Sequence, residues 1–280
     1  PQWLSSCAEK NPDDVAVCAV PLGCNNYVYS TFPPKDWGIW RAIVYETVDV
    51  LLDLTDKGGS PRDVYLESAN EPDATCYWND THAHFLDYYK QTALAFSDAR
   101  DSLCVSKGLL PERCARLKFG GPAASLWSGR IDTTPDAPTA SLCEELITYA
   151  LAEAAIDPRV RLDFVSFHGF WPSTAGGPRS NISKALNAIN ASYVSHAGTT
   201  PPFAAPKVLI TEWNGADAER AQPRHAALIA ETYYAFSEHD LRLNVIASLD
   251  QQASTSSLDD GDFGLLVTTP LGIDWRRPAF

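Results

Sequence analysis

The sequence predicts an α/β fold of the (β/α)8 barrel type, in which helices cover a parallel sheet. Short, nearly continuous apolar stretches, typical of strands buried on both faces, alternate with longer stretches whose apolar residues recur at helical spacing. This alternation requires crossover connections, which make neighbouring strands parallel. The conspicuous polar residues lie where apolar stretches end, and in a (β/α)8 barrel that face carries the chemistry.

The predicted strands begin about 35 to 50 residues apart, which leaves room for one helix and long loops in each unit. They are Val64–Ala69, Arg116–Gly120, Leu162–His168, Lys207–Glu212 and Leu243–Leu249. No Gly-x-Gly-x-x-Gly motif follows any of these stretches, so the sequence does not support a dinucleotide site.

Helices are predicted between the strands. They are Asp36–Leu54, His82–Ser102, Ser141–Ala155, Ser183–His196 and Pro223–His239. Asp36 is the expected N-cap of the first helix, which ends before Gly58-Gly59. Thr81 or Asn79 is expected to cap the second helix, and Pro223 suits a first helical turn.

Composition predicts one large domain over residues 1–280, because the chain has 280 residues of which 45% are hydrophobic. A net charge of -13 disfavours nucleic acids and anionic membranes as partners. No apolar run approaches the roughly 18 to 20 residues of a membrane span. Neutral carbohydrates, small molecules and proteins remain as partners.

Seven cysteines without a Cys-x-x-Cys pair argue against a zinc or redox motif. Cys104 and Cys114 flank a short segment and are expected to form a disulfide. Further candidates are Cys18 and Cys24, together with Cys7 and Cys76. Their connectivity cannot be deduced from the sequence.

Three N-glycosylation sequons begin at Asn79, Asn181 and Asn190. Together with the cysteines, they favour a secreted, extracellular protein. The chain contains no methionine, which indicates a processed chain or a fragment.

Two predicted strands each end in a glutamate, Glu71 in VYLESANEPDA and Glu212 in KVLITEWNG. The glutamates are three βα units apart, so in an eight-stranded barrel their strands face one another across the mouth. Two converging carboxylates suit glycoside hydrolysis, in which one carboxyl protonates the leaving oxygen and the other attacks the anomeric carbon. A single glutamate at a strand end is more often a solvated or salt-bridged group, but the pair is far more specific.

The motifs ESANEPD and LITEWNG, at this spacing, resemble the clan A glycoside hydrolases, and most closely family 39 with its β-xylosidases and α-L-iduronidases. Three other segments resemble family 39: the helix before strand 4 (FPPKDWGIWRAIVYETVDVLLD), the end of strand 6 (VSFHGFW) and the closing segment (GDFGLLVTTPLGIDWRRPAF). The resemblance implies a retaining enzyme that needs no cofactor, with Glu71 as general acid/base and Glu212 as nucleophile.

The resemblance also implies contacts with a carbohydrate substrate. Asn70 would hydrogen-bond the sugar 2-hydroxyl, and His168 would contact the sugar or the nucleophile, the alternative being a histidine of the pocket wall. Trp213 and Trp171 are candidates for stacking on sugar faces, and Trp171 suits loop packing equally well.

The resemblance covers strands 4 to 8 of the barrel, so strands 1 to 3 and the last helix are expected on another polypeptide or in another part of a longer chain. Asp250, Gln251 and Gln252 stand where clan members often end strand 8 in an aromatic platform. These departures leave an alternative, a catalytically silent relative that serves as a structural or carbohydrate-binding extracellular module.

Metal chemistry is not predicted, because the sequence has no His-Glu-x-x-His motif and no glycine-rich phosphate loop. His82 and His84 form a His-x-His pattern, but they precede a helix and have no obvious third ligand.

Overall fold

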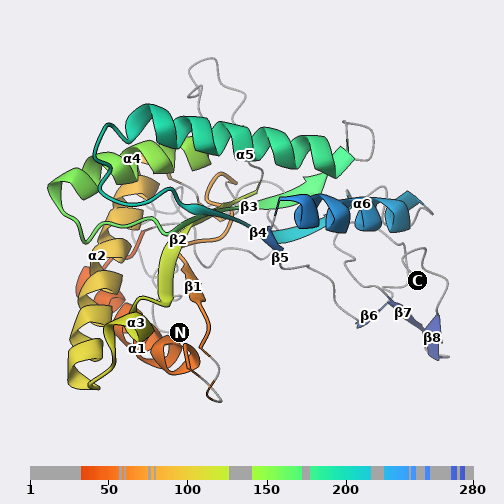
Figure 1. The fold of residues 1–280 in the computed structure, drawn as a ribbon. Coiled ribbons are helices and arrows are strands. Elements are labelled where there is room, and N and C mark those ends of the chain that lie inside the picture. Colours follow the sequence, from red (N-terminus) through yellow and green to blue (C-terminus); the bar gives the residue numbers. More distant parts are fainter. Residues whose placement is uncertain are drawn as a thin grey trace, which may run out of the picture.

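The computed structural model describes residues 33–56, 59, 61–74, 77–78, 80–125, 141–171, 177–215, 224–239, 241–243, 250–252, 266–269 and 272–274. Its main sheet contains five parallel strands in the order β1-β2-β3-β4-β5, so each strand pairs with its neighbour in sequence, and helices flank the sheet (Figure 1). The strands are β1 (Val64–Glu67), β2 (Leu117–Ala124), β3 (Phe164–Trp171), β4 (Lys207–Gly215) and β5 (Arg242–Leu243). The predicted order and parallel direction are confirmed.

The carboxyl ends of four predicted strands differ from the structure. β3 and β4 continue past the predicted His168 and Glu212 to Trp171 and Gly215, because the two strands stay paired with each other. β2 continues past Gly120 to Ala124, because its backbone stays paired with β3 through the small residues. β1 ends at Glu67, since the chain turns away after it. The fifth predicted strand is described only at Leu243, because residues 244–249 lie outside the described part. A second, three-stranded sheet contains β6 (Asp250–Gln252), β7 (Leu266–Thr269) and β8 (Gly272–Asp274).

The helices agree with the predicted periodicity and caps. They are α1 (Trp37–Leu54), α2 (His82–Ser106), α3 (Pro111–Cys114), α4 (Leu142–Ile156), α5 (Gly177–His196) and α6 (Arg224–Glu238). Asp36 caps α1 and Thr81 caps α2 through side-chain oxygens that accept backbone N–H groups. α5 begins before the predicted Ser183, because Pro178 is tolerated in a first helical turn.

The hydrophobic core lies between the helices and the outer face of the sheet. Phe119 of β2 stacks on Phe96 of α2 with ring centroids 5.0 Å apart, and Phe167 and Ile210 belong to the same buried cluster. Because side chains alternate along a strand, the residues between these core positions face the opposite, concave side of the sheet.

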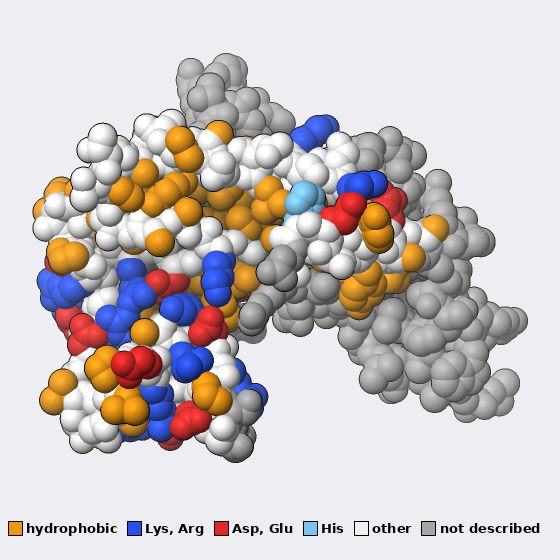
Figure 2. Space-filling model, viewed as in Figure 1, with side chains coloured by type: hydrophobic (Ala, Val, Ile, Leu, Met, Phe, Trp, Pro, Cys, Tyr) orange, Lys and Arg blue, Asp and Glu red, His pale blue; other side chains and the backbone are white. Residues whose placement is uncertain are grey.

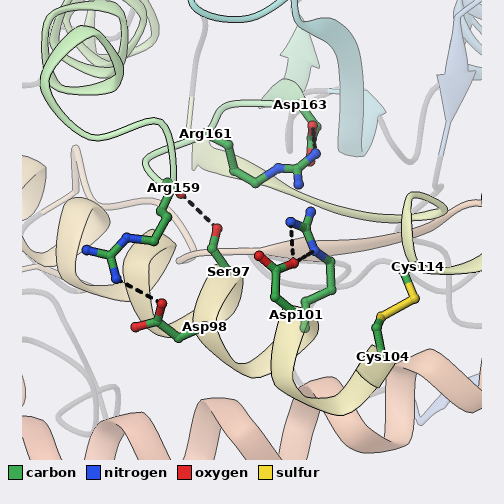
Figure 3. Close-up of polar contacts among 9 residues, drawn as sticks. Ser97, Asp98, Asp101, Cys104, Cys114, Arg159, Arg161 and Asp163 are labelled. Atoms are coloured by element: carbon green, nitrogen blue, oxygen red, sulfur yellow. Dashed lines mark hydrogen bonds and ion pairs between the residues drawn. A yellow bond between two sulfur atoms is a disulfide. The ribbon is translucent and has the colours of Figure 1, made fainter. Parts of the chain in front are cut away.

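The segment that leads into β3 is bound to α2 by hydrogen bonds and an ion pair (Figure 3). Ser97 donates to the Arg159 carbonyl at 2.7 Å, and Arg159 pairs with Asp98 at 2.9 Å. The predicted disulfide joins Cys104 at the end of α2 to Cys114 in α3. The remaining cysteine candidates lie outside the described residues; they are Cys7, Cys18, Cys24 and Cys76.

On the face in Figure 2, charged side chains of both signs are interspersed around α1, α2 and α3, whereas the surface over α4 and α5 is mostly uncharged. Two sequon asparagines lie on α5, where Asn181 is part-buried and Asn190 is exposed, while Asn79 is outside the described residues. None of the described helices combines the length and hydrophobicity needed to cross a membrane.

Candidate active site

Glu71 lies in a tight turn just beyond β1, and the turn is anchored to the end of β2. Its backbone φ of 45° is in the left-handed region, which is rare for a residue with a side chain. The Glu71 N–H donates to the Ala123 carbonyl at 2.8 Å, and the Asp73 carboxylate accepts from the Ser125 N–H and hydroxyl, both at 2.8 Å. These contacts hold an unfavourable backbone conformation in place, as is common at functional sites.

The end of β2 contains an extra residue that links its two neighbouring strands. Pro122 pairs with Ser166 and Ala124 with Phe167, so Ala123 has no partner in the ladder and bulges with a φ of 55°. Its N–H donates to the Ser166 hydroxyl at 3.0 Å, while its carbonyl receives the Glu71 N–H. The bulge thus sets the position of Glu71 relative to β3.

A second bulge, at Thr211, turns Glu212 toward the concave side. Ile210 pairs with Phe167 and Glu212 with His168, so Thr211 is the extra residue. Ile210 and Phe167 face the core, and strict alternation would place Glu212 on that face as well. The inserted residue reverses the alternation, which brings Glu212 beside His168.

His168 of β3 joins the two glutamates. Its side chain is fully buried, and its Nδ1 lies 2.7 Å from Glu71 Oε1 and 3.3 Å from Glu212 Oε2. One ligand-type atom from each of the three side chains lies within 4.8 Å of the others. The structure therefore brings together three of the predicted site residues, from the turn after β1 and from strands β3 and β4.

These distances fit hydrogen bonding better than shared metal ligation. Two atoms bound to one zinc ion at about 2.1 Å are about 3 Å or more apart. The Nδ1 of His168 and Oε1 of Glu71 are closer, at 2.7 Å, which is a normal distance for sharing one proton. We therefore interpret the contact as a hydrogen bond.

Burial and neighbouring charges change the pKa of the Glu212 carboxyl group. Burial raises the pKa of its carboxyl group, and the negative charges of Glu71 and Glu67 raise it further, whereas His168 lowers it. A raised pKa at one member of a carboxyl pair is expected when both groups share one site and one imidazole.

Glu67 was not predicted as a site residue. Burial raises the pKa of its carboxyl group, against the opposite effects of the Ser166 and Thr211 hydroxyls and of His168. A usable signal was present in the sequence, since an acidic residue interrupts the apolar stretch VYLE. The alternation of side chains predicts on which face of the sheet Glu67 lies, but it does not predict which other strands its side chain contacts.

The prediction that Trp213 stacks on a sugar is wrong. Its side chain is 1% exposed and packs edge-on against Tyr233 and Phe236 of α6. The physical reason is strand alternation, because the residue after an inward Glu212 must point outward to the helices.

Among the described side chains, the remaining predicted site residues do not belong to the cluster of Glu71, His168 and Glu212. Asn70 is exposed in the turn that carries Glu71, and the Trp171 side chain lies outside the described part. The two histidines of the His-x-His pattern contact separate carboxylates, since His82 Nδ1 lies 3.1 Å from Glu145 and His84 Nδ1 lies 2.7 Å from Asp80.

Two glutamates that converge at the carboxyl edge of a parallel sheet have the arrangement that glycoside hydrolases of the (β/α)8 type use. Residues 22–249 match the family described as glycosyl hydrolases family 39. The chain belongs to this family.

Solved structures support the same fold. A family 39 β-xylosidase from Caulobacter crescentus is similar with a TM-score of 0.56 and 22% identity, over 89% of this chain and 47% of that one. A glucosidase from Croceicoccus marinus has a TM-score of 0.51 and 16% identity, over 77% of this chain and 38% of that one. The chain thus spans less than half the length of these two structures, and its strands form part of a (β/α)8 barrel. A comparison with curated proteins finds no match.

Proposed function

We propose that the chain carries the catalytic part of a secreted, retaining glycoside hydrolase that cleaves O-glycosidic bonds in a carbohydrate. The observation that supports this most is the approach of Glu71 and Glu212, whose carboxylate oxygens lie within 4.8 Å. Retaining enzymes hold their carboxyl groups about 5 to 5.5 Å apart, whereas inverting enzymes leave about 6.5 to 9.5 Å for a water molecule.

The mechanism is a double displacement. The Glu212 carboxylate attacks the anomeric carbon and forms a glycosyl ester, while Glu71 gives its proton to the departing oxygen. Glu71, now ionised, removes a proton from water, which attacks the same carbon and releases Glu212. His168, whose Nδ1 lies close to both carboxyl groups, holds Glu71 and Glu212 in position for these steps.

The substrate contacts and the setting belong to the same proposal. Asn70, exposed beside Glu71, would bind the 2-hydroxyl of the sugar. The β-xylosidase and the glucosidase among the similar solved structures suggest xylosides and glucosides as the first substrates to test. The disulfide and the sequons support an extracellular location, and the remaining barrel strands would come from another polypeptide or from more of the same chain.

A trapped intermediate tests the proposal. An activated 2-deoxy-2-fluoro glycoside reacts with a retaining nucleophile and releases its leaving group, but its fluorine slows hydrolysis of the ester. We expect mass spectrometry to find the label on Glu212, and early NMR spectra of ordinary substrates to show retained anomeric configuration. Inverted product, or an absence of label and turnover across xylosides and glucosides, would overturn the proposal.

A further inference from the structure

Glu67 reaches across the concave side of the sheet. It belongs to β1, yet the hydroxyls that act on its carboxyl group, from Ser166 and Thr211, belong to β3 and β4. A side chain on the first strand reaches the third and fourth only if the sheet curls and the second strand leaves space.

The second strand carries glycines at positions 120 and 121, and Gly120, the ladder partner of Glu67, places no side chain between Glu67 and β3. A Cβ atom at Gly120 would collide with the Phe164 carbonyl, and one at Gly121 would collide with the Ser68 hydroxyl. Both positions therefore need glycine, and β1, β2 and β3 approach one another closely here.

The Glu67 carboxyl group is only partly satisfied. Its Oε1 is buried, and no described residue hydrogen-bonds it. A buried carboxylate of this kind costs free energy, so its presence beneath a catalytic pair calls for a functional explanation.

We propose that Glu67 is a positioning residue of the glycosidase site: from beneath the catalytic pair, it fixes the strands that carry His168 and Glu212 and supplies a third negative charge there. Thr211, beside Glu67, is the bulge residue that turns Glu212 inward. The Ser166 hydroxyl accepts the N–H of Ala123, whose carbonyl in turn accepts the Glu71 N–H. This inference rests on the proposed function.

The charge of Glu67 acts on the candidate site. Among the described residues whose charge acts on this cluster are His168 from β3, Glu212 from β4 and Glu71 beyond β1. Loss of the Glu67 charge would therefore act on Glu212, whose pKa that charge raises.

Glu67→Gln in the full chain tests the proposal, with Glu46→Gln on the exposed surface of α1 as the matched control. We expect Glu67→Gln to lower kcat about tenfold to a hundredfold with little change in KM, as misplaced reacting groups do. The acid limb of the pH profile should move to lower pH, because Glu212 loses a neighbouring negative charge. The melting temperature at pH 7 should stay equal or rise, since a buried charge has been removed.

A purely structural role gives a different pattern. A lower melting temperature with an unchanged pH profile and an unchanged kcat in the folded fraction would overturn the proposal. Titration of the Glu212 carboxyl by 13C NMR, assigned with Glu212→Gln, separates the two hypotheses. If the wild-type chain turns over no glycoside, the proposed function fails. The proposal for Glu67 is then refuted only if its replacement leaves the Glu212 titration unchanged.

Discussion

The two ends of the main sheet are built differently. At the amino end, Asp163 accepts the Phe119 N–H at 2.8 Å and pairs with Arg161, and a disulfide closes the neighbouring helix pair. At the carboxyl end, Glu71 and Ala123 have positive φ values, and Glu67 Oε1 is buried without a described partner. The amino end therefore consists of ordinary stabilising contacts, whereas the carboxyl end holds residues in strained conformations, as the proposed catalytic role would require.

The largest expected loss of activity follows the replacement of Glu212, at the carboxyl end of the sheet. Glu212→Gln keeps the shape but removes the attacking carboxylate, so kcat should fall by about a thousandfold or more. Steady-state kinetics on an aryl glycoside measure this loss, and circular dichroism should show an unchanged fold. Activity within tenfold of the wild type would refute the assignment of the nucleophile.

Replacement of Glu71 should give a loss that depends on the substrate. Glu71→Ala removes the proton donor, so glycosides with poor leaving groups should slow about a hundredfold to ten-thousandfold, as expected for general acid catalysis. Dinitrophenyl glycosides need little protonation, and their first step should be nearly unaffected. The measurement is a plot of rate against leaving-group pKa, and equal losses for all leaving groups would contradict an acid role.

Substitutions at the amino end of the sheet should lower the stability of the fold and leave the activity of the folded protein unchanged. A double variant, Cys104→Ser with Cys114→Ser, opens a loop of sequence separation 10 and should lower the free energy of unfolding by about 2 to 3 kcal/mol. Urea unfolding measures the change, and kcat of the folded protein serves as the control. A loss of kcat with unchanged stability would show that the two ends are not separate in function.

The smallest expected effect is on the pH dependence of folding stability. Burial raises the pKa of Glu67 and Glu212 in the folded chain, so both bind protons more tightly there than when unfolded. Their contribution to stability is therefore fully present below about pH 4.5 and is lost as the pH rises through the folded pKa values. Melting curves of Glu67→Gln and the wild type should converge at low pH and separate toward neutral pH, with the variant more stable. A variant that is less stable at neutral pH would contradict this sign.

Local sequence determined the order of strands and helices, the caps at Asp36 and Thr81, and the placement of two glutamates at strand ends. These features follow from periodicity and from hydrogen bonds within a few residues, which the sequence contains directly. The pairing of Cys104 with Cys114 was accessible for the same reason, because only ten positions separate them.

Tertiary structure alone decided which way the site residues face. The bulges at Ala123 and Thr211 depend on the register of neighbouring strands, and they set Glu71 and turn Glu212 inward. Trp213 points outward to α6, and Glu67 of β1 reaches Ser166 of β3 and Thr211 of β4. The local sequence pattern predicts neither of these directions. A single inserted residue reverses the facing of every residue after it, so side-chain direction follows from strand pairing and not from the sequence of one strand.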